Sequence, residues 1–434
     1  MSTVANNIVT SEMRFTRLQD WLSWQEGLHF TAIELGLDRC RQVAANMGLL
    51  DPDFKVISIS GTNGKGSSAC MLDTILRRSG LRVGTYTSPH LLVYNERISI
   101  NGKQVNDADL CRSFDRIDKH RGDISLTYFE FGTLAALDIF HSAGLDIAIM
   151  EVGLGGRLDA VNILDADIAL LTTVDFDHEV WLGHDRESIG REKAGIFRAG
   201  RAAVCSDLCP PESVCEHAAG IGAKLYRVGR DFNFSASASS WSWHSNSRHY
   251  AALPAPGINR MQIRNAAGVL MVLQLLGEEY RFDGEIIRES LRDFALAGRL
   301  QSVAGEIPCI LDVAHNPQAI SALVDNVNRL PSSGANHLVV GMLRDKNHDT
   351  VFKLLQQIAD HWYLADIDSD RAALTGELQQ ALQQYVAADD IARYPSVGAA
   401  LARAHARAKP GDRIIVTGSF VTVGAALHYL ESVR

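Results

Sequence analysis

A short glycine-rich segment contains the residues best suited to chemistry in this 434-residue chain. The segment is GTNGKGS, and its residues are Gly61, Thr62, Asn63, Gly64, Lys65, Gly66 and Ser67. Glycines let consecutive backbone N–H groups converge on a phosphate, and a lysine reaches the outer phosphates. An apolar run precedes the segment and a helix-like stretch follows it. The pattern therefore predicts a nucleotide-phosphate loop rather than a glycine turn with a surface lysine.

The loop departs from the common GxxxxGK[ST] pattern at two positions. Ile59 stands where the first glycine usually lies, and Gly66 follows the lysine where a magnesium-binding Ser or Thr is usual. Ser67 comes one position too late. We therefore expect some ligands of a bound magnesium ion to come from other parts of the chain.

Polar residues that could supply those ligands follow three predicted strands: Ser88, Glu151, and the group Asp175, Asp177 and His178. The carboxyl ends of parallel strands meet at one edge of a sheet, where α/β proteins bind ligands. A hydroxyl, a carboxylate and an imidazole could share Mg²⁺ with ATP phosphates, although histidine is an unusual magnesium ligand. The alternative for each residue is a solvated position in a loop.

The elements that position these residues alternate between short apolar runs and helical patterns, with a helix predicted over 262–276. Strands are predicted at 56–60, 82–87, 147–152, 168–174 and 202–205, and then at 309–313, 338–342, 362–365 and 414–417. A Ser- and aromatic-rich segment, 224–256, predicts a small antiparallel excursion whose part 235–250 is a variable surface hairpin. The fold class is α/β. We predict an N-terminal P-loop domain with a mostly parallel sheet (1–296) and a smaller Rossmann-like C-terminal domain (297–434).

Composition limits the class of protein. The net charge of −9 argues against a nucleic-acid or basic membrane surface. The N-terminus lacks an apolar signal-like core, and no apolar run reaches the roughly 18 residues of a membrane span. The seven cysteines are scattered, and Cys205, Cys209 and Cys215 contain no CxxC pair, so we expect reduced thiols rather than zinc. These features predict a cytoplasmic protein.

Several longer segments carry a family resemblance: TSPHL with NERI, EVGLGGRLDA, GREKAGIFR and DVAHNP, besides the glycine loop. Together they closely resemble the folylpolyglutamate synthase / dihydrofolate synthase family, a branch of the Mur-ligase-like ATP-dependent amide ligases. The matches run from residue 35 to residue 420. The resemblance implies that ATP phosphorylates a carboxylate, that L-glutamate attacks the acyl phosphate, and that ADP and phosphate leave.

The resemblance also implies roles for individual residues. For ATP they are the loop residues 61–67 with Asn265, Arg299 and Asp312; for Mg²⁺, Ser88, Glu151 and His178; for catalysis, Lys65, Lys193 and His315; and for glutamate, His315 and Ser419. Lys193 matches a lysine that the family carries as a carbamate. A helix-surface lysine is the alternative there.

Three segments correspond to the pterin and folate contacts of the family: Glu34, Leu35 and Gly36; Thr127, Tyr128, Phe129 and Glu130; and Leu158, Asp159 and Ala160. A flat bicyclic ring fits an aromatic surface with a few hydrogen-bond partners. Without the resemblance, Tyr128 and Phe129 read more simply as the start of an ordinary helix core.

SLTYFEFGT marks the branch that accepts dihydropteroate as well as folates, so we interpret the chain as bifunctional. The expected small molecules are ATP, L-glutamate, dihydropteroate and reduced folates, with a monomer as the default state. The alternatives are a folylpolyglutamate synthase only, a peptidoglycan-type Mur ligase, or a nucleotide-dependent switch. Peptidoglycan ligases usually carry a further α/β domain ahead of the loop, whereas only 60 helical-looking residues precede Gly61 here.

Overall fold

A computed structural model describes residues 13–237, 240–256, 260–277, 280 and 282–433. Its largest sheet has eight strands in the order β4-β3-β2-β5-β1-β6-β7-β8. The strands are β1 (Lys55–Ser60), β2 (Val83–Tyr86), β3 (Ile98–Ile100), β4 (Lys103–Gln104), β5 (Ile147–Glu151), β6 (Ile168–Leu171), β7 (Ala202–Cys205) and β8 (Lys224–Arg227). All neighbours from β2 to β8 pair in parallel, and β3 and β4 extend one edge antiparallel.

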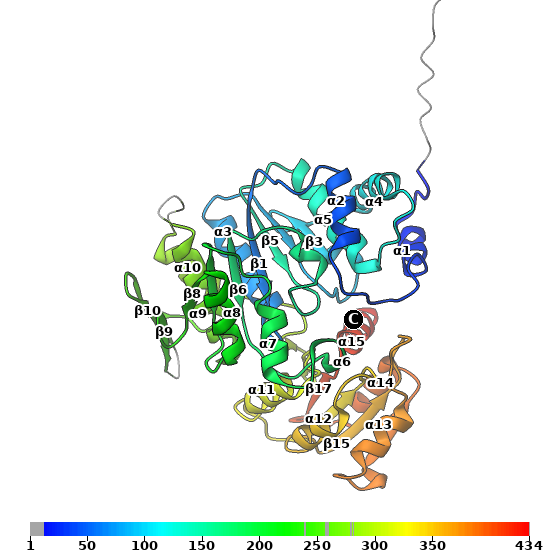
Figure 1. Ribbon diagram of the computed structural model, residues 1–434. Helices are drawn as coiled ribbons and strands as arrows, with labels where there is room; N and C mark the ends of the chain where they lie inside the picture. The colour runs from blue at the N-terminus through cyan, green and yellow to red at the C-terminus, as the bar shows by residue number, and fades with distance from the viewer. Residues whose placement is uncertain (1–12, 238–239, 257–259, 278–279, 281, 434) are drawn as a thin grey trace, which may run out of the picture.

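Helices cover both faces of this sheet (Figure 1). On one side lie α1 (Leu18–Glu26), α2 (Asp38–Asn46), α4 (Asp107–Arg121), α5 (Tyr128–Ser142), α7 (Arg186–Ala194) and α8 (Glu212–Ile221). On the other lie α3 (Lys65–Arg78), α9 (Arg260–Leu275) and α10 (Gly284–Arg292). Val56 packs into the first layer, and Ile57 and Ile59 pack into the second. Burial on both faces explains why the strands are continuously apolar.

The five N-terminal strands predicted from the sequence are confirmed, although the fourth ends at Leu171 rather than at residue 174. The hairpin of β3 and β4 was not predicted. Its turn is Asn101-Gly102, and both residues have positive φ (50° and 72°). This Asn-Gly pair is the usual signal for a two-residue hairpin, and it was present in the sequence.

The segment 224–256 differs from its prediction in two ways. β8 belongs to the large sheet and runs parallel to β7. Only β9 (Phe232–Ala236), β10 (Trp241–Ser245) and β11 (His249–Leu253) form a separate antiparallel sheet. The prediction of a surface hairpin describes only part of this sheet, because one face of β10 is buried: Trp241 and Trp243 are 1% and 0% exposed. The Trp243 indole donates to the carbonyl of Ala267 in α9 at 3.1 Å, which fixes the small sheet against that helix.

The C-terminal sheet has six strands in the order β12-β13-β17-β14-β15-β16. They are β12 (Gln301–Val303), β13 (Cys309–Leu311), β14 (Asn336–Val340), β15 (His361–Ala365), β16 (Ile391–Tyr394) and β17 (Arg413–Thr417). One face carries α11 (Pro317–Val327), α12 (His348–Leu355) and α13 (Thr375–Leu382), and the other carries α14 (Val397–Arg407) and α15 (Phe420–Ser432). The four predicted strands are present. The edge strands β12 and β16 were missed because they are short and only half-buried.

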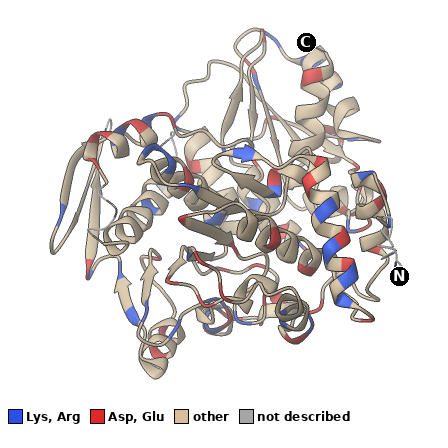
Figure 2. Ribbon diagram, turned by 90° about the horizontal axis from the view of Figure 1, so that it is seen from above, with Lys and Arg blue, Asp and Glu red and all other residues tan. Residues whose placement is uncertain are grey.

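The fold class is thus α/β, as predicted, with the C-terminal region (yellow to red) below the large sheet in Figure 1. The domain boundary near residue 296 stays a prediction. Acidic and basic residues are interspersed along the helices (Figure 2). In α4, for example, Asp109, Arg112, Asp115 and Lys119 alternate in charge. Within the described residues, no helix has the length and apolar character needed to span a bilayer.

Candidate active site

The glycine loop lies at the carboxyl end of β1, between β5 and β6, and leads directly into α3. This is the place where connections diverge to the two sides of a parallel sheet and where such sheets bind ligands. Gly61 has φ +149°, and a Cβ there would lie 1.9 Å from Thr172 Oγ1. Gly64 has φ +91°, and a Cβ there would lie 2.4 Å from Asn265 Oδ1. Both positions therefore require glycine.

The carboxylate of Glu151 lies beside the glycine that follows Lys65. A Cβ on Gly66 would lie 3.5 Å from Glu151 Oε2, so the carboxylate stands beside the position where other loops carry a hydroxyl. The Ser88 backbone N–H donates to the same oxygen at 3.2 Å. Burial raises the pKa of Glu151, while the positive charges of Lys65, Arg299 and Arg97 oppose that rise. A carboxylate beside a phosphate loop suits a hard cation such as Mg²⁺.

Lys65 itself folds back over the loop. Its Nζ donates to the carbonyl of Gly61 at 2.9 Å, and the carbonyl of Thr62 lies at 3.5 Å. The Thr62 hydroxyl donates to the carbonyl of Asp175 at 2.9 Å, which ties the loop to the segment that follows β6. The lysine is thus positioned at the phosphate-binding surface without a carboxylate partner among the described ion pairs.

His178 has no direct polar contact with Ser88 or Glu151 among the described residues. In the described part of the chain, no group of three His, Cys, Asp or Glu side chains could by itself hold a metal. His178 adopts a left-handed backbone (φ 53°, ψ 37°) at the start of α6 (Glu179–Leu182). Burial lowers the pKa of its imidazole to about 3. The ring is therefore neutral, the form that binds metals.

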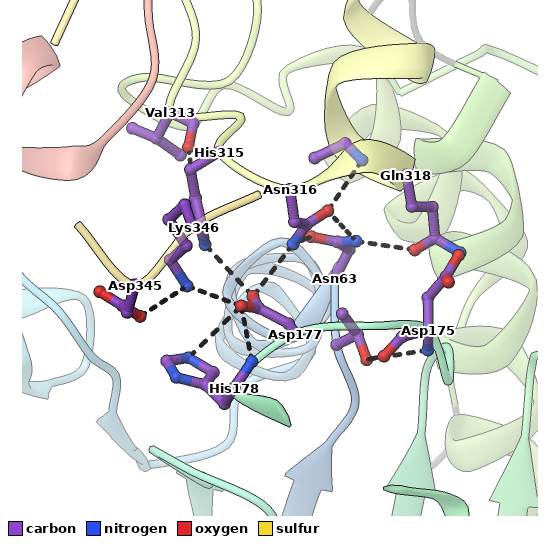
Figure 3. Close-up of polar contacts among 12 residues, drawn as sticks. Asn63, Asp175, Asp177, His178, Val313, His315, Asn316, Gln318, Asp345 and Lys346 are labelled. Carbon is purple, nitrogen blue, oxygen red and sulfur yellow. Dashed lines mark hydrogen bonds and ion pairs between the residues drawn. The ribbon is translucent and has the colours of Figure 1, made fainter. Parts of the chain in front are cut away.

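Asp177 is the centre of a polar cluster that joins the two domains (Figure 3). Its Oδ1 accepts from Lys346 Nζ at 2.6 Å, and its Oδ2 accepts from Asn316 Nδ2 at 3.1 Å and lies 3.4 Å from His315 Nε2. Although burial alone would raise the pKa of Asp177, the contacts with His315, His178 and Lys346 hold it well below the usual range. We call Asp177, His178, His315, Asn316 and Lys346 the Asp177 cluster.

The glycine loop touches the second domain directly beside this cluster. Asn63 Nδ2 donates to Asn316 Oδ1 at 3.1 Å and to Gln318 Oε1 at 2.7 Å. Asn316 caps α11, since its side chain accepts from the N–H of Ala319. A cavity of about 450 Å³ opens at the cluster, and its walls include Ile33, Phe176, Trp181, His315, Lys346 and Arg371.

Lys193, on α7, is almost completely buried, with an exposed fraction of 4%. Burial, with the nearby charge of Lys65, lowers the pKa of its amine to about 7. Among the described residues it forms no ion pair. The alternative of a helix-surface lysine is therefore wrong. A lysine that is half neutral near pH 7 has the reactivity that carbamate formation needs, because the neutral amine is the nucleophile.

The residues expected to contact ATP lie around the loop. Asn265, 1% exposed, leaves its Oδ1 without a described hydrogen-bond partner at the surface of Gly64. Arg299 stacks on the ring of Phe420 at 5.0 Å, and its charge acts on both Glu151 and Asp312. Asp312 accepts from the N–H groups of Leu300 and Ala314, and burial raises its pKa.

The two residues expected to bind glutamate differ in whether their side chains are already hydrogen-bonded within the protein. His315 lines the cavity and faces Asp177. Ser419 is buried at the start of α15, where its Oγ lies 2.7 Å from Thr422 Oγ1 and accepts from the Thr422 N–H at 3.0 Å. The hydroxyl of Ser419 therefore already serves as a helix cap.

The three predicted pterin segments come together at one place. The Gly36 N–H donates to the carbonyl of Leu158 at 3.1 Å. Phe129 packs so closely on Gly153 that a Cβ there would lie 2.6 Å from its ring. Asp159 accepts from Leu154 N–H, and burial raises its pKa to about 6. A partly exposed Tyr128 stands beside Phe129 at the start of α5.

The two glutamates of these segments are already engaged. Arg39 forms ion pairs with both Glu34 and Glu130. Glu130 also accepts from the Thr127 N–H at 2.7 Å in a reciprocal capping box. Their carboxylates therefore hold the wall of this region together.

Two residues of the site were missed by reasoning from the sequence. Lys346 follows the end of β14, and the rule that singled out Ser88 and Glu151 at strand ends would have found it. Arg97 lies in the segment NERI, which contributes to the family resemblance, but the segment itself does not indicate a role for the arginine.

Comparison with known proteins agrees with this geometry. The Mur ligase middle domain matches residues 59–231, and the Mur ligase, glutamate ligase domain matches residues 298–420. The chain is 40% identical to the dihydrofolate synthase/folylpolyglutamate synthase of Escherichia coli over 96% of both proteins, and 38% identical to that of Haemophilus influenzae over 94% of this chain and 96% of that protein.

Solved structures give the same picture. E. coli FolC in complex with DHPP and ADP superposes with a TM-score of 0.92 at 40% identity, covering 96% of this chain and 99% of that one. A bifunctional folylpolyglutamate synthase/dihydrofolate synthase with Mn, AMPPNP and L-glutamate bound has a TM-score of 0.89 at 44% identity, covering 96% and 98%. Two linked α/β domains with a phosphate loop facing a glutamate ligase domain define the class of Mur ligases. Within this class, the chain belongs to the dihydrofolate synthase/folylpolyglutamate synthase family.

Proposed function

We propose that this protein uses ATP to join L-glutamate to 7,8-dihydropteroate and to reduced folates through an acyl phosphate, releasing ADP and phosphate. The observation that carries the proposal is the contact of Asn63, in the phosphate loop, with Asn316 and Gln318 of the glutamate ligase domain. This contact places the nucleotide loop and the second domain at one site, which suits a reaction that must exclude water.

Each part of the site has a task in this reaction. The glycine loop cradles the phosphates, and Lys65 turns from the loop carbonyls to the transferred phosphoryl group. Tyr128 and Phe129 offer the aromatic surface for the pterin-bearing acid. Lys346 and His315, both lining the cavity, offer hydrogen bonds to the carboxylates of glutamate.

We propose that a magnesium ion is held by Ser88, Glu151 and His178 together with ATP. A divalent cation at this place supplies positive charge that offsets the negative charge of the phosphates. Manganese in the related structure supports a divalent ion. The neutral imidazole of His178 and the buried carboxylate of Glu151 fit such an ion.

Lys193 is proposed to act as a carbamate, whose negative charge would lie near Lys65. Purified protein depleted of carbon dioxide should lose activity and regain it with bicarbonate. Carbon-13-labelled bicarbonate should then give a carbamate signal in the wild type and none in Lys193→Met. Full activity in the depleted protein would rule out the carbamate.

We further propose that the enzyme is a cytoplasmic monomer.

Glutamate-dependent release of ADP tests the function as a whole. MgATP is supplied with 7,8-dihydropteroate in one series and with tetrahydrofolate in another, each with and without L-glutamate. Release with both acceptors supports the bifunctional proposal. Release with tetrahydrofolate alone would restrict the enzyme to polyglutamylation, and release with neither would contradict the proposal.

A further inference from the structure

Arg97 lies between two tyrosine rings without an anionic partner. It ends the short helix η1 (Tyr94–Arg97), and its carbonyl accepts from the Thr87 N–H at 2.9 Å, which fixes its backbone beside β2. Its guanidinium carbon lies 5.2 Å from the ring centre of Tyr94 and 5.5 Å from that of Tyr128. The two rings meet edge to face, 5.6 Å apart.

One edge of the guanidinium is occupied and the other is available. Nε donates to His90 Nδ1 at 2.9 Å, which fixes the plane of the group. Within the described residues, the two terminal nitrogens have no hydrogen-bond acceptor, and no carboxylate forms an ion pair with Arg97. The neighbouring Glu96 instead accepts from the N–H groups of Leu91, Leu92 and Val93. A half-buried cation with a fixed plane and a free edge is a receptor for a planar anion.

The position of Arg97 indicates which anion it receives. On one side it contacts Tyr128, at the aromatic surface of the pterin region. On the other side its carbonyl accepts from the Thr87 N–H, and the next residue, Ser88, donates its N–H to the Glu151 carboxylate beside the phosphate loop. Arg97 therefore lies between the aromatic surface and the phosphate loop, where a substrate with an aromatic body presents its acid group.

We propose that the two terminal nitrogens of Arg97 bind the carboxylate of the pterin-bearing acid and hold it toward the phosphate loop. This inference rests on the proposed function, and it adds a specificity residue for an acid attached to a flat aromatic group. Arg97 would make bidentate hydrogen bonds to both carboxylate oxygens and leave one of them free at its second lone pair to attack phosphorus.

The test compares binding of an acid with binding of its uncharged ester. Dissociation constants of 7,8-dihydropteroate and of its methyl ester are measured by fluorescence or calorimetry in the presence of MgAMPPNP, for wild type and Arg97→Met. Loss of a charge-assisted pair should weaken acid binding on the order of 30–100-fold and leave ester binding within about threefold. A purely structural role would weaken both ligands equally, and that result would overturn the inference.

Two further variants keep the test decisive. Arg97→Lys retains the charge without the fork, so it should keep part of the preference for the acid even if Arg97→Met does not fold; equal binding of acid and ester by Arg97→Lys would overturn the inference. Arg121→Met is the matched control. Arg121 also stacks on an aromatic ring, that of Trp24 at 5.3 Å, but it is paired with Asp118, so acid binding should not change.

The outcome separates this inference from the proposed function. If wild-type protein releases ADP with dihydropteroate and glutamate while Arg97→Met binds the acid as tightly as wild type, the function stands and the role of Arg97 is wrong. Weaker AMPPNP binding in Arg97→Met with unchanged acid binding would assign the residue to the nucleotide instead, and would also overturn the inference.

Discussion

The Asp177 carboxylate and the Lys346 ammonium form a buried ion pair of 2.6 Å between the two domains. Their side chains are only 8% and 5% exposed. Asp177 follows β6 of the first sheet and Lys346 follows β14 of the second, so this pair connects the ends of two strands in different domains. Removing one partner of such a pair leaves the other charge buried without compensation.

Asp177→Asn is therefore expected to impair the alignment of the two domains. The loss of about 3 kcal/mol for a broken buried pair corresponds to roughly a 100-fold decrease in kcat/KM for glutamate. Steady-state kinetics measure this effect. Asp165→Asn serves as control, because Asp165 pairs with Arg198 at the surface and is 69% exposed, and such pairs contribute little. Equal activity of Asp177→Asn and the control would show that the pair has no role in the reaction.

Lys65→Ala should abolish synthesis while leaving the fold intact. The lysine contacts only loop carbonyls, so its removal does not open the core, whereas loss of a positive charge at the transferred phosphoryl group should lower kcat by at least about 10²–10³-fold. ADP release and circular dichroism measure the two properties. The exposed Lys224→Ala is the control. Retained turnover in Lys65→Ala would refute the assignment of the loop.

Lys193 should give stability a specific dependence on pH in protein free of carbon dioxide. Its pKa is about 7 in the folded chain, against an ordinary value of 10.5 for a lysine. Between these values the unfolded chain binds a proton that the folded chain lacks, so stability rises with pH. Below pH 7 the full cost of burying the charge, about 5 kcal/mol, remains. Lys193→Met lacks this cost.

The urea midpoints of wild type and Lys193→Met measure that difference. The variant should be the more stable protein below pH 7, and the two midpoints should converge as the pH approaches 10.5. A difference between the two midpoints that stays constant from pH 7 to pH 10.5 would contradict this prediction. It would mean that burial of the protonated Lys193 amine does not destabilise the folded chain.

Tyr128→Ala should weaken the use of dihydropteroate. The ring is partly exposed, contacts Arg97 and Tyr94, and offers an apolar face. Losing it should raise the apparent KM for dihydropteroate by about 10–30-fold, the effect of about 1.5–2 kcal/mol of aromatic contact. Tyr128→Phe keeps the ring and should stay close to wild type. An unchanged KM in Tyr128→Ala would assign the residue to the helix core alone.

Much of this arrangement could be predicted from local patterns. The loop, the continuous apolar strands and the polar residues at their ends each have a local signal, and these located β1, Glu151 and Ser88. The proximity of Gly66 to the Glu151 carboxylate could be seen only in the structure, because Glu151 ends β5, 85 positions further along the chain.

Other features depend on contacts between distant segments. Asp177 and Lys346 are separated by 169 positions in the chain, so no local pattern indicates that they form a pair. Likewise, the alternation of aromatic residues and serine in β10 is typical of a surface hairpin. In the structure, however, Trp241 and Trp243 are buried, and Trp243 bonds to α9. The free terminal nitrogens of Arg97 depend on which side chains surround it in the fold, so the sequence alone could not predict them.

Transfer of heavy oxygen from the acid to phosphate tests the central claim most directly. Dihydropteroate labelled with heavy oxygen in its carboxylate is incubated with the protein, MgATP and L-glutamate, and the released phosphate is analysed by mass spectrometry. Ligation through an acyl phosphate predicts that one labelled oxygen appears in the phosphate for each amide bond formed. Amide formation with unlabelled phosphate, or ATP hydrolysis without a glutamylated product, would contradict the account.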